Sequence, residues 1–155
     1  MSAAVKREML VNASRAHAFK VFTDDINRWW PREHHIGKSP LKRAVIEPQV
    51  SGRWYSICED DSEIDVGRVQ TWDPPNRVVM TWQINGSWQY DPNFVTIIDV
   101  AFEDVTPTQC RVLFEHRGLD AYGPASDAVR MMFEAPNGWG ETLSHFQRLA
   151  EESAS

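Results

Sequence analysis

Cysteine and basic residues are scarce in this sequence, and long hydrophobic runs are absent. Its 155 residues include two cysteines, Cys58 and Cys110, which lie far apart and form no CxxC pair. This usage offers no disulfide framework and indicates two buried free thiols in a cytoplasmic protein. No apolar stretch resembles a signal peptide or could span a bilayer, so we expect no membrane insertion.

Basic charge is also in deficit. Sixteen Lys and Arg residues face 22 Asp and Glu residues, which gives a net charge of −6. A protein that binds a phosphate backbone needs a clustered basic face. We therefore expect no nucleic-acid partner.

Tryptophan is the residue that the sequence has in excess, with 7 Trp and 7 Phe against 3 Tyr. So many indoles in a small protein favour broad apolar walls, although a Trp-rich core would explain the same count. The chain is long enough to bury a real core. Neither a repeat nor a linker interrupts it, so residues 1–155 are predicted to form a single domain.

The N-terminal part predicts a strand followed by helical segments. Residues 4–12 alternate in hydrophobicity, as a half-buried strand does. Asn12 and Ser14 offer N-caps, and apolar residues then recur at helical spacing until Pro31 ends the run. The loop that follows carries His34 and His35.

From residue 41 onward the hydrophobic period becomes two, and turn signals recur at short intervals. This pattern is typical of antiparallel strands joined as a meander. In three of these strands every second residue is predicted to point inward. The inward residues are Val78, Met80, Trp82 and Ile84 in the first strand, Phe94, Thr96, Ile98, Val100 and Phe102 in the second, and Cys110, Val112, Phe114 and His116 in the third.

One further strand, "EIDVGRV", carries charge. Because side chains alternate between the two faces of a strand, Glu63 and Asp65 are predicted to lie on one face and Arg68 on the other. We interpret this segment as an acidic strand at the edge of the sheet. Gly67 marks a bulge or a close backbone approach.

The period changes back to helical near the C-terminus. Pro124 can start a helix, and a final helix follows the "APNGWG" break. That helix carries an apolar stripe formed by Trp139, Leu143, Phe146, Leu149 and Ala150. The order of elements predicts an α+β fold with helices on one face of a curled antiparallel sheet. A helix laid in the concave side need not fill it, and a cavity results.

Four segments carry a resemblance to a known family. They are "FTDDINRWWP" at 22–31, "GRVQTWDPPNRVVMTW" at 67–82, "CRVLFEHRGL" at 110–119 and "NGWGETLSHFQRL" at 137–149. Together they resemble the helix-grip superfamily, also called START-like or SRPBCC. Within it they are similar to the family of homologues of the activator of the heat-shock-protein-90 ATPase (AHSA).

The resemblance implies a helix-grip fold, in which a curved antiparallel sheet of about seven strands wraps around a long C-terminal helix. It also implies two short helices after the first strand and an apolar cavity between sheet and C-terminal helix. Superfamily members bind lipids, sterols, plant hormones or polyketides there, and a minority are cyclases, aromatases or hydratases.

Co-chaperone members of the family carry an additional N-terminal domain that contacts the chaperone. The first strand predicted here begins almost at Met1. We therefore expect no chaperone partner unless such a domain is present. A monomer and a homodimer are both compatible with the sequence.

The predicted cavity lining combines inward strand residues with large groups from loops and helices. Packing alone would also bury these residues, so each is a candidate for both roles. Trp30, Trp88, Met132 and Trp139 come from loops or helix starts and are candidates for the cavity mouth. The predicted ligand-binding residues are Trp30, His35, Trp54, Met80, Trp82, Phe102, Phe114, His116, Met132, Trp139 and Leu143.

His116, in the stretch "FEHRGLD", is the polar member of the inward face. Glu115 and Arg117 point away from it by parity, so the three residues do not form a triad. His116 could orient a ligand or act as an acid or base. Alternatively it is structural, hydrogen-bonded to the loop after Gly118. We assign no catalytic residue.

His34 and His35 are adjacent and lack a metal-ligand spacing, so we predict neither a metal nor another cofactor.

Three functions remain open from the sequence. The first is a cytoplasmic domain that binds a small apolar or aromatic molecule in the cavity. The second is an enzyme of the polyketide cyclase or aromatase type, with His116 as acid or base. The third is a protein-interaction domain of the co-chaperone kind, which should show an exposed apolar patch outside the cavity.

Overall fold

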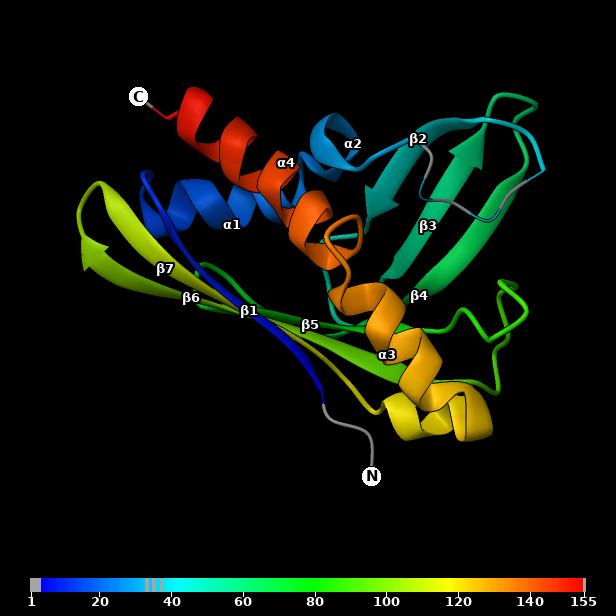
Figure 1. The fold of residues 1–155 in the computed structure, drawn as a ribbon. Coiled ribbons are helices and arrows are strands. Elements are labelled where there is room, and N and C mark those ends of the chain that lie inside the picture. The colour runs from blue at the N-terminus through cyan, green and yellow to red at the C-terminus, as the bar shows by residue number, and fades with distance from the viewer. Residues whose placement is uncertain (1–3, 33, 35, 37, 155) are drawn as a thin grey trace.

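A seven-stranded antiparallel sheet curls around the C-terminal helix in the computed structural model of the chain (Figure 1). The structure describes residues 4–32, 34, 36 and 38–154. The strand order is β1-β7-β6-β5-β4-β3-β2, so a meander runs from β2 to β7 and β1 completes the sheet beside β7. The strands are β1 (Val5–Val11), β2 (Leu41–Ile46), β3 (Arg53–Cys58), β4 (Glu63–Asp73), β5 (Arg77–Trp82), β6 (Thr96–Thr106) and β7 (Gln109–Arg117). The predicted α+β helix-grip architecture is confirmed.

Two short helices follow the first strand, as expected. They are α1 (Arg15–Thr23) and α2 (Ile26–Trp29). The hydroxyl of Ser14 caps α1 by accepting a hydrogen bond from the backbone N–H of His17 at 3.2 Å. Near the C-terminus, the 3₁₀ segment η1 (Leu119–Ala125) contains Pro124 and leads into α3 (Ser126–Glu134).

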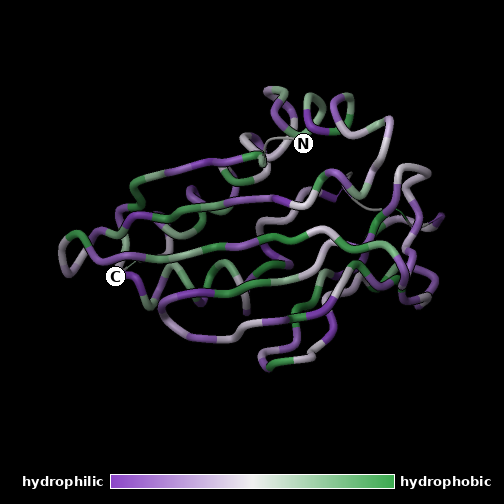
Figure 2. The backbone as a smooth tube through the Cα atoms, turned by 90° about the horizontal axis from the view of Figure 1, so that it is seen from below, coloured by the Kyte–Doolittle hydropathy of each residue, from purple (hydrophilic) through white to green (hydrophobic). Residues whose placement is uncertain are grey.

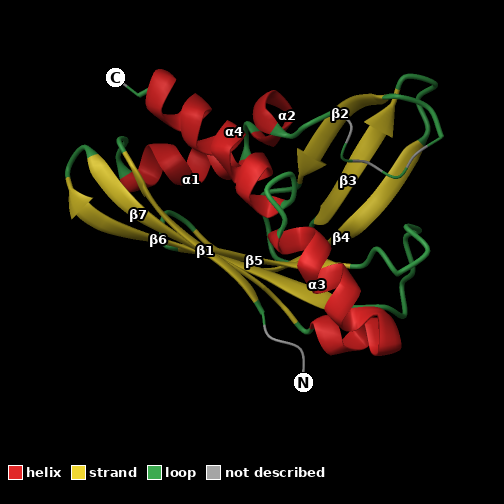
Figure 3. Cartoon of the chain, viewed as in Figure 1, coloured by secondary structure: helices red, strands yellow, loops and turns green. Residues whose placement is uncertain are grey.

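Helix α4 (Trp139–Glu152) lies in the concave side of the sheet together with α1 and α2 (Figures 1 and 3). Strands β2, β3 and β4 rise away from the plane of the other four, so the sheet half-encloses the helix. The predicted apolar stripe of α4 is the face that it buries. Trp139, Leu143, Phe146 and Ala150 are buried, and Leu149 is partly buried.

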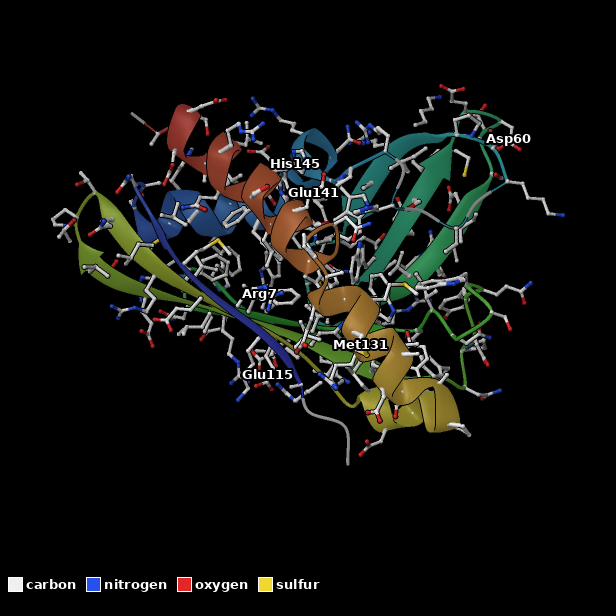
Figure 4. All side chains as sticks on the ribbon, viewed as in Figure 1. Arg7, Asp60, Glu115, Met131, Glu141 and His145 are labelled. Carbon is white, nitrogen blue, oxygen red and sulfur yellow. The ribbon has the colours of Figure 1, made fainter. Side chains whose placement is uncertain are left out.

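Alternation between the two faces of β5, β6 and β7 agrees with the predicted parity. All inward residues of β7 are buried, and the charged residues of its outer face, Arg111, Glu115 and Arg117, form ion pairs. Seen from below, the strands alternate between hydrophilic and hydrophobic residues (Figure 2). Glu115 lies on the side of the sheet opposite α4, whose Glu141 and His145 project away from the sheet (Figure 4).

Strand β4 departs from the prediction in two respects. It is an interior strand between β3 and β5 rather than an edge. Its Arg68 also shares a face with Asp65, whose carboxylate lies 3.5 Å from the Arg68 guanidinium. A bulge explains the second error. The register slips between Trp54 and Tyr55, which leaves Val66 as the extra residue and reverses the parity beyond it.

Gly67 is required at this bulge, as predicted, because β5 approaches its backbone closely. A Cβ atom at Gly67 would lie 1.9 Å from the carbonyl oxygen of Thr81. Since that neighbour is backbone of a central strand, the sheet itself would have to shift.

Gly67→Ala should therefore destabilise the fold by about 1–3 kcal/mol, as overpacking does. Urea denaturation followed by circular dichroism measures the free energy of unfolding. Gly86→Ala is the matched control, because the nearest atom to its Cβ is 3.9 Å away. Equal effects of the two substitutions would contradict the assignment of the bulge.

Candidate functional site

A pocket of about 440 Å³ opens between α3, the start of α4 and the inner face of β5. Five Trp and Phe side chains are part of its wall, namely Trp30, Trp82, Trp88, Phe133 and Trp139. Trp88 and Met132 stand at the exposed rim, with exposed fractions of 41% and 49%. The pocket thus lies at the N-terminal end of α4, while Phe146, further along the helix, packs against Phe22 of α1 and Trp29 of α2.

Trp82 lies at the centre of a cluster of aromatic rings at the base of the pocket, which we call the floor and which also includes Trp54, Phe133 and Trp139. Its ring centroid is 5.7 Å from that of Trp54, 5.6 Å from Trp139 and 6.0 Å from Phe133. These tilted and edge-to-face contacts are the arrangements that aromatic quadrupoles favour. The floor is consequently a set of interlocked rings.

The indole of Trp82 is also anchored by a hydrogen bond. Its Nε1 donates to the Tyr122 hydroxyl at 3.2 Å, and that hydroxyl donates to the carbonyl of Ile84 at 2.7 Å. Burial raises the pKa of Tyr122 to about 12, so the phenol stays neutral and keeps its donor proton.

His116 lies beneath this floor and is completely buried. Its Nε2 is 2.8 Å from the hydroxyl of Thr96, and its Nδ1 accepts from the indole Nε1 of Trp139 at 3.2 Å. The Thr96 hydroxyl donates its own proton to the carbonyl of Trp82 at 2.9 Å. Thr96 therefore accepts from His116, which fixes the ring as the neutral Nε2–H tautomer.

This arrangement removes His116 from acid–base chemistry near neutral pH. Burial lowers its pKa to about 3, and both ring nitrogens already have partners. A second proton on Nδ1 would face the indole N–H of Trp139, donor against donor. The structural alternative named a hydrogen bond to the loop after Gly118, but the partners of the ring are Thr96 and Trp139.

The sequence-predicted site residues separate into four groups. Trp30, Trp82, Met132 and Trp139 line the pocket, as does Trp88. Trp54 lines a smaller hollow beside it. His35 lies outside the described residues. The remaining five are buried in the packed core and do not line the pocket; they are Met80, Phe102, Phe114, His116 and Leu143.

A polar pair in the wall was not among the predicted site residues. Nδ1 of His34 is 3.0 Å from the hydroxyl of Thr142, and the indole of Trp30 donates to the carbonyl of His34 at 2.7 Å. Thr142 follows Trp139 by three residues on α4, so helical spacing could have placed it on the same wall. Nothing in the sequence links it to His34.

Other chemistry is limited within the described part of the chain. No group of three His, Cys, Asp or Glu residues there could hold a metal ion. Both cysteines are buried free thiols, and burial raises the pKa of Cys110 to about 11. No helix in those ranges is long and apolar enough to cross a membrane.

Comparison with known families agrees with this architecture. The family model described as "Activator of Hsp90 ATPase homolog 1-like protein" matches residues 12–151. The chain belongs to this family. A comparison with functionally curated proteins finds no match.

Solved structures of similar proteins cover nearly the whole chain. An anthrahydroquino-γ-pyrone synthase, Txn09, is 34% identical with a TM-score of 0.67, over 96% of this chain and 97% of that one. The self-sacrificing resistance protein CalC from Micromonospora echinospora is 29% identical with a TM-score of 0.73, over 98% and 96%. Protein MLL2253 from Mesorhizobium loti is 15% identical with a TM-score of 0.66, over 99% and 100%, and shows the fold alone.

The stability of the fold should depend on pH through His116. The unfolded chain binds a proton there below about pH 6.5, whereas the folded protein does so only near pH 3. The stability that the neutral ring contributes is complete above pH 6.5 and is lost as the pH falls towards 3. Between pH 7 and pH 5 the loss should be about 2 kcal/mol.

Urea denaturation at the two pH values measures this loss. His116→Gln, which keeps a donor and an acceptor without titrating, should show a smaller pH dependence than the wild type. His145→Gln, on the outer side of α4, is the control. An unchanged pH dependence in His116→Gln would contradict the assignment.

Proposed function

We propose that this protein binds a neutral, largely apolar aromatic small molecule in the pocket between α3, α4 and β5. The observation that carries the proposal is the pocket itself, which has a volume of about 440 Å³ and is lined by five Trp and Phe side chains. Small-molecule sites have roughly this size and composition, with a few polar groups that set the ligand's orientation.

The polar part of the wall supports a neutral ligand. Beside the indoles, the polar side chains that line the pocket are those of His34, Asn137 and Thr142. None of the described lining residues is Asp, Glu, Lys or Arg. A charged ligand would lose its hydration without gaining an ionic partner, which is costly.

The similar structures support an aromatic ligand. One is named as the synthase of an anthrahydroquino-γ-pyrone, a fused-ring compound, and it aligns with almost the whole chain at 34% identity. Flat fused rings suit a wall of indoles, which offer both faces and edges for stacking.

A synthase activity is the second candidate. The same 34% identity favours it, together with the His34–Thr142 pair, which sets an imidazole against the pocket. Native mass spectrometry of the purified protein, followed by chromatography of any released molecule, separates the two functions. A binding protein leaves the molecule unchanged on incubation, whereas an enzyme converts it.

Binding can be tested with 1,8-dihydroxyanthraquinone as a probe. Titration should quench tryptophan fluorescence saturably, because Trp30, Trp82, Trp88 and Trp139 line the pocket. Met132→Ala should weaken the probe's affinity about 3- to 10-fold, since it removes apolar wall.

The adjacent Met131 provides the matched control. It lies on the same helix, is 64% exposed and does not line the pocket (Figure 4). Met131→Ala should leave the affinity unchanged. Absence of saturable quenching in the wild type, or equal effects of the two substitutions, would contradict binding in this pocket.

A further inference from the structure

A second, smaller hollow adjoins the pocket. It measures about 20 Å³ and is bounded by inward side chains of β2, β3 and β4. Its wall shares five residues with the pocket, which are Trp30, His34, Ile36, Trp82 and Ile84. The two spaces therefore meet at these side chains, with Trp54 on the far side of Trp30 and Trp82.

Ser56 is the polar side chain that β3 places in this hollow. It is 7% exposed and follows Trp54 by two residues, so both point inward from the strand. No hydrogen bond joins its hydroxyl to another described residue, and the oxygen is not among the fully buried atoms that lack a partner, so it is open to the hollow. The neighbouring wall is otherwise apolar on this side, with Ala44, Ile64 and Val66.

A hydroxyl that opens onto a confined, largely apolar hollow favours an occupant that can form a hydrogen bond with it. The hollow is large enough for about one water molecule. A buried water, however, is held by two to four polar groups, and apart from the indoles the only polar side chains lining this hollow among the described residues are those of Ser56 and His34. An oxygen atom of a ligand can form the hydrogen bond with Ser56 without needing other hydrogen bonds to hold it in place, because it is covalently attached to the ligand.

We infer that the hollow receives a hydroxyl or carbonyl substituent of the pocket's ligand, with Ser56 as its hydrogen-bond partner. The inference rests on the proposed function and narrows its ligand class to aromatic compounds that bear oxygen at one end. The ring system lies in the pocket against Trp82, and its oxygen points between Trp30 and Trp82 towards β3. Ser56 thereby selects oxygenated rings over plain hydrocarbons.

Two probes that differ by one oxygen test the inference. The affinities of 2-naphthol and naphthalene are measured by tryptophan fluorescence on wild type and Ser56→Ala. The loss of one neutral hydrogen bond should weaken 2-naphthol about 3- to 10-fold and leave naphthalene within about 2-fold. Ser56→Cys keeps the side-chain shape with a weaker hydrogen-bonding group, and should show the same selectivity to a smaller degree.

Ser144→Ala is the matched control, because Ser144 is an exposed serine of α4 whose hydroxyl donates to the Glu141 carbonyl. It should change neither affinity. If both probes bind the wild type and Ser56→Ala affects them equally or not at all, the inference is overturned while the proposed function stands. If the wild type binds neither probe, both fall.

Discussion

A hydrogen-bonded chain through His116 holds the first turn of α4 over the sheet. The indole of Trp139 donates to the imidazole, the imidazole to Thr96, and Thr96 to the backbone of Trp82. The chain thus ties α4 to β7, β6 and β5 in succession. Its two ends, Trp139 and Trp82, are walls of the pocket, so the same bonds that fix the helix also fix the shape of the site.

Aromatic residues serve two purposes in this fold, because some fill the core along α4 and others line the pocket at its N-terminal end. Towards the C-terminal end Phe146 packs edge-on against Phe22, with ring centroids 5.3 Å apart, and the interior is filled. At the N-terminal end of α4 a corner connects it to α3. The corner is tight, since a Cβ atom on Gly138 would lie 2.4 Å from the carbonyl oxygen of Phe133. The rings there pack against one another and also line the pocket.

Periodicity made the sheet faces and the buried stripe of α4 predictable, because a period of two or 3.6 depends only on local geometry. It failed beyond Val66, where one extra residue reversed the parity of Arg68. The contacts within the site were harder to predict from the sequence. Thr142 meets His34 across 108 residues of sequence, and the partners of His116 lie on other elements. Such contacts arise from tertiary packing and leave no local pattern.

The central claim is that His116 is a neutral, doubly hydrogen-bonded structural residue whose ring fixes α4 above the pocket. Nitrogen-15 NMR of the imidazole rings tests it most directly, because the two ring nitrogens report protonation and tautomer separately. For His116 we expect the Nε2–H tautomer at pH 8, with nitrogen shifts unchanged down to pH 5, since burial holds its pKa near 3. Titration of this ring with a midpoint near its ordinary value of about 6.5, or a proton on Nδ1, would contradict the account.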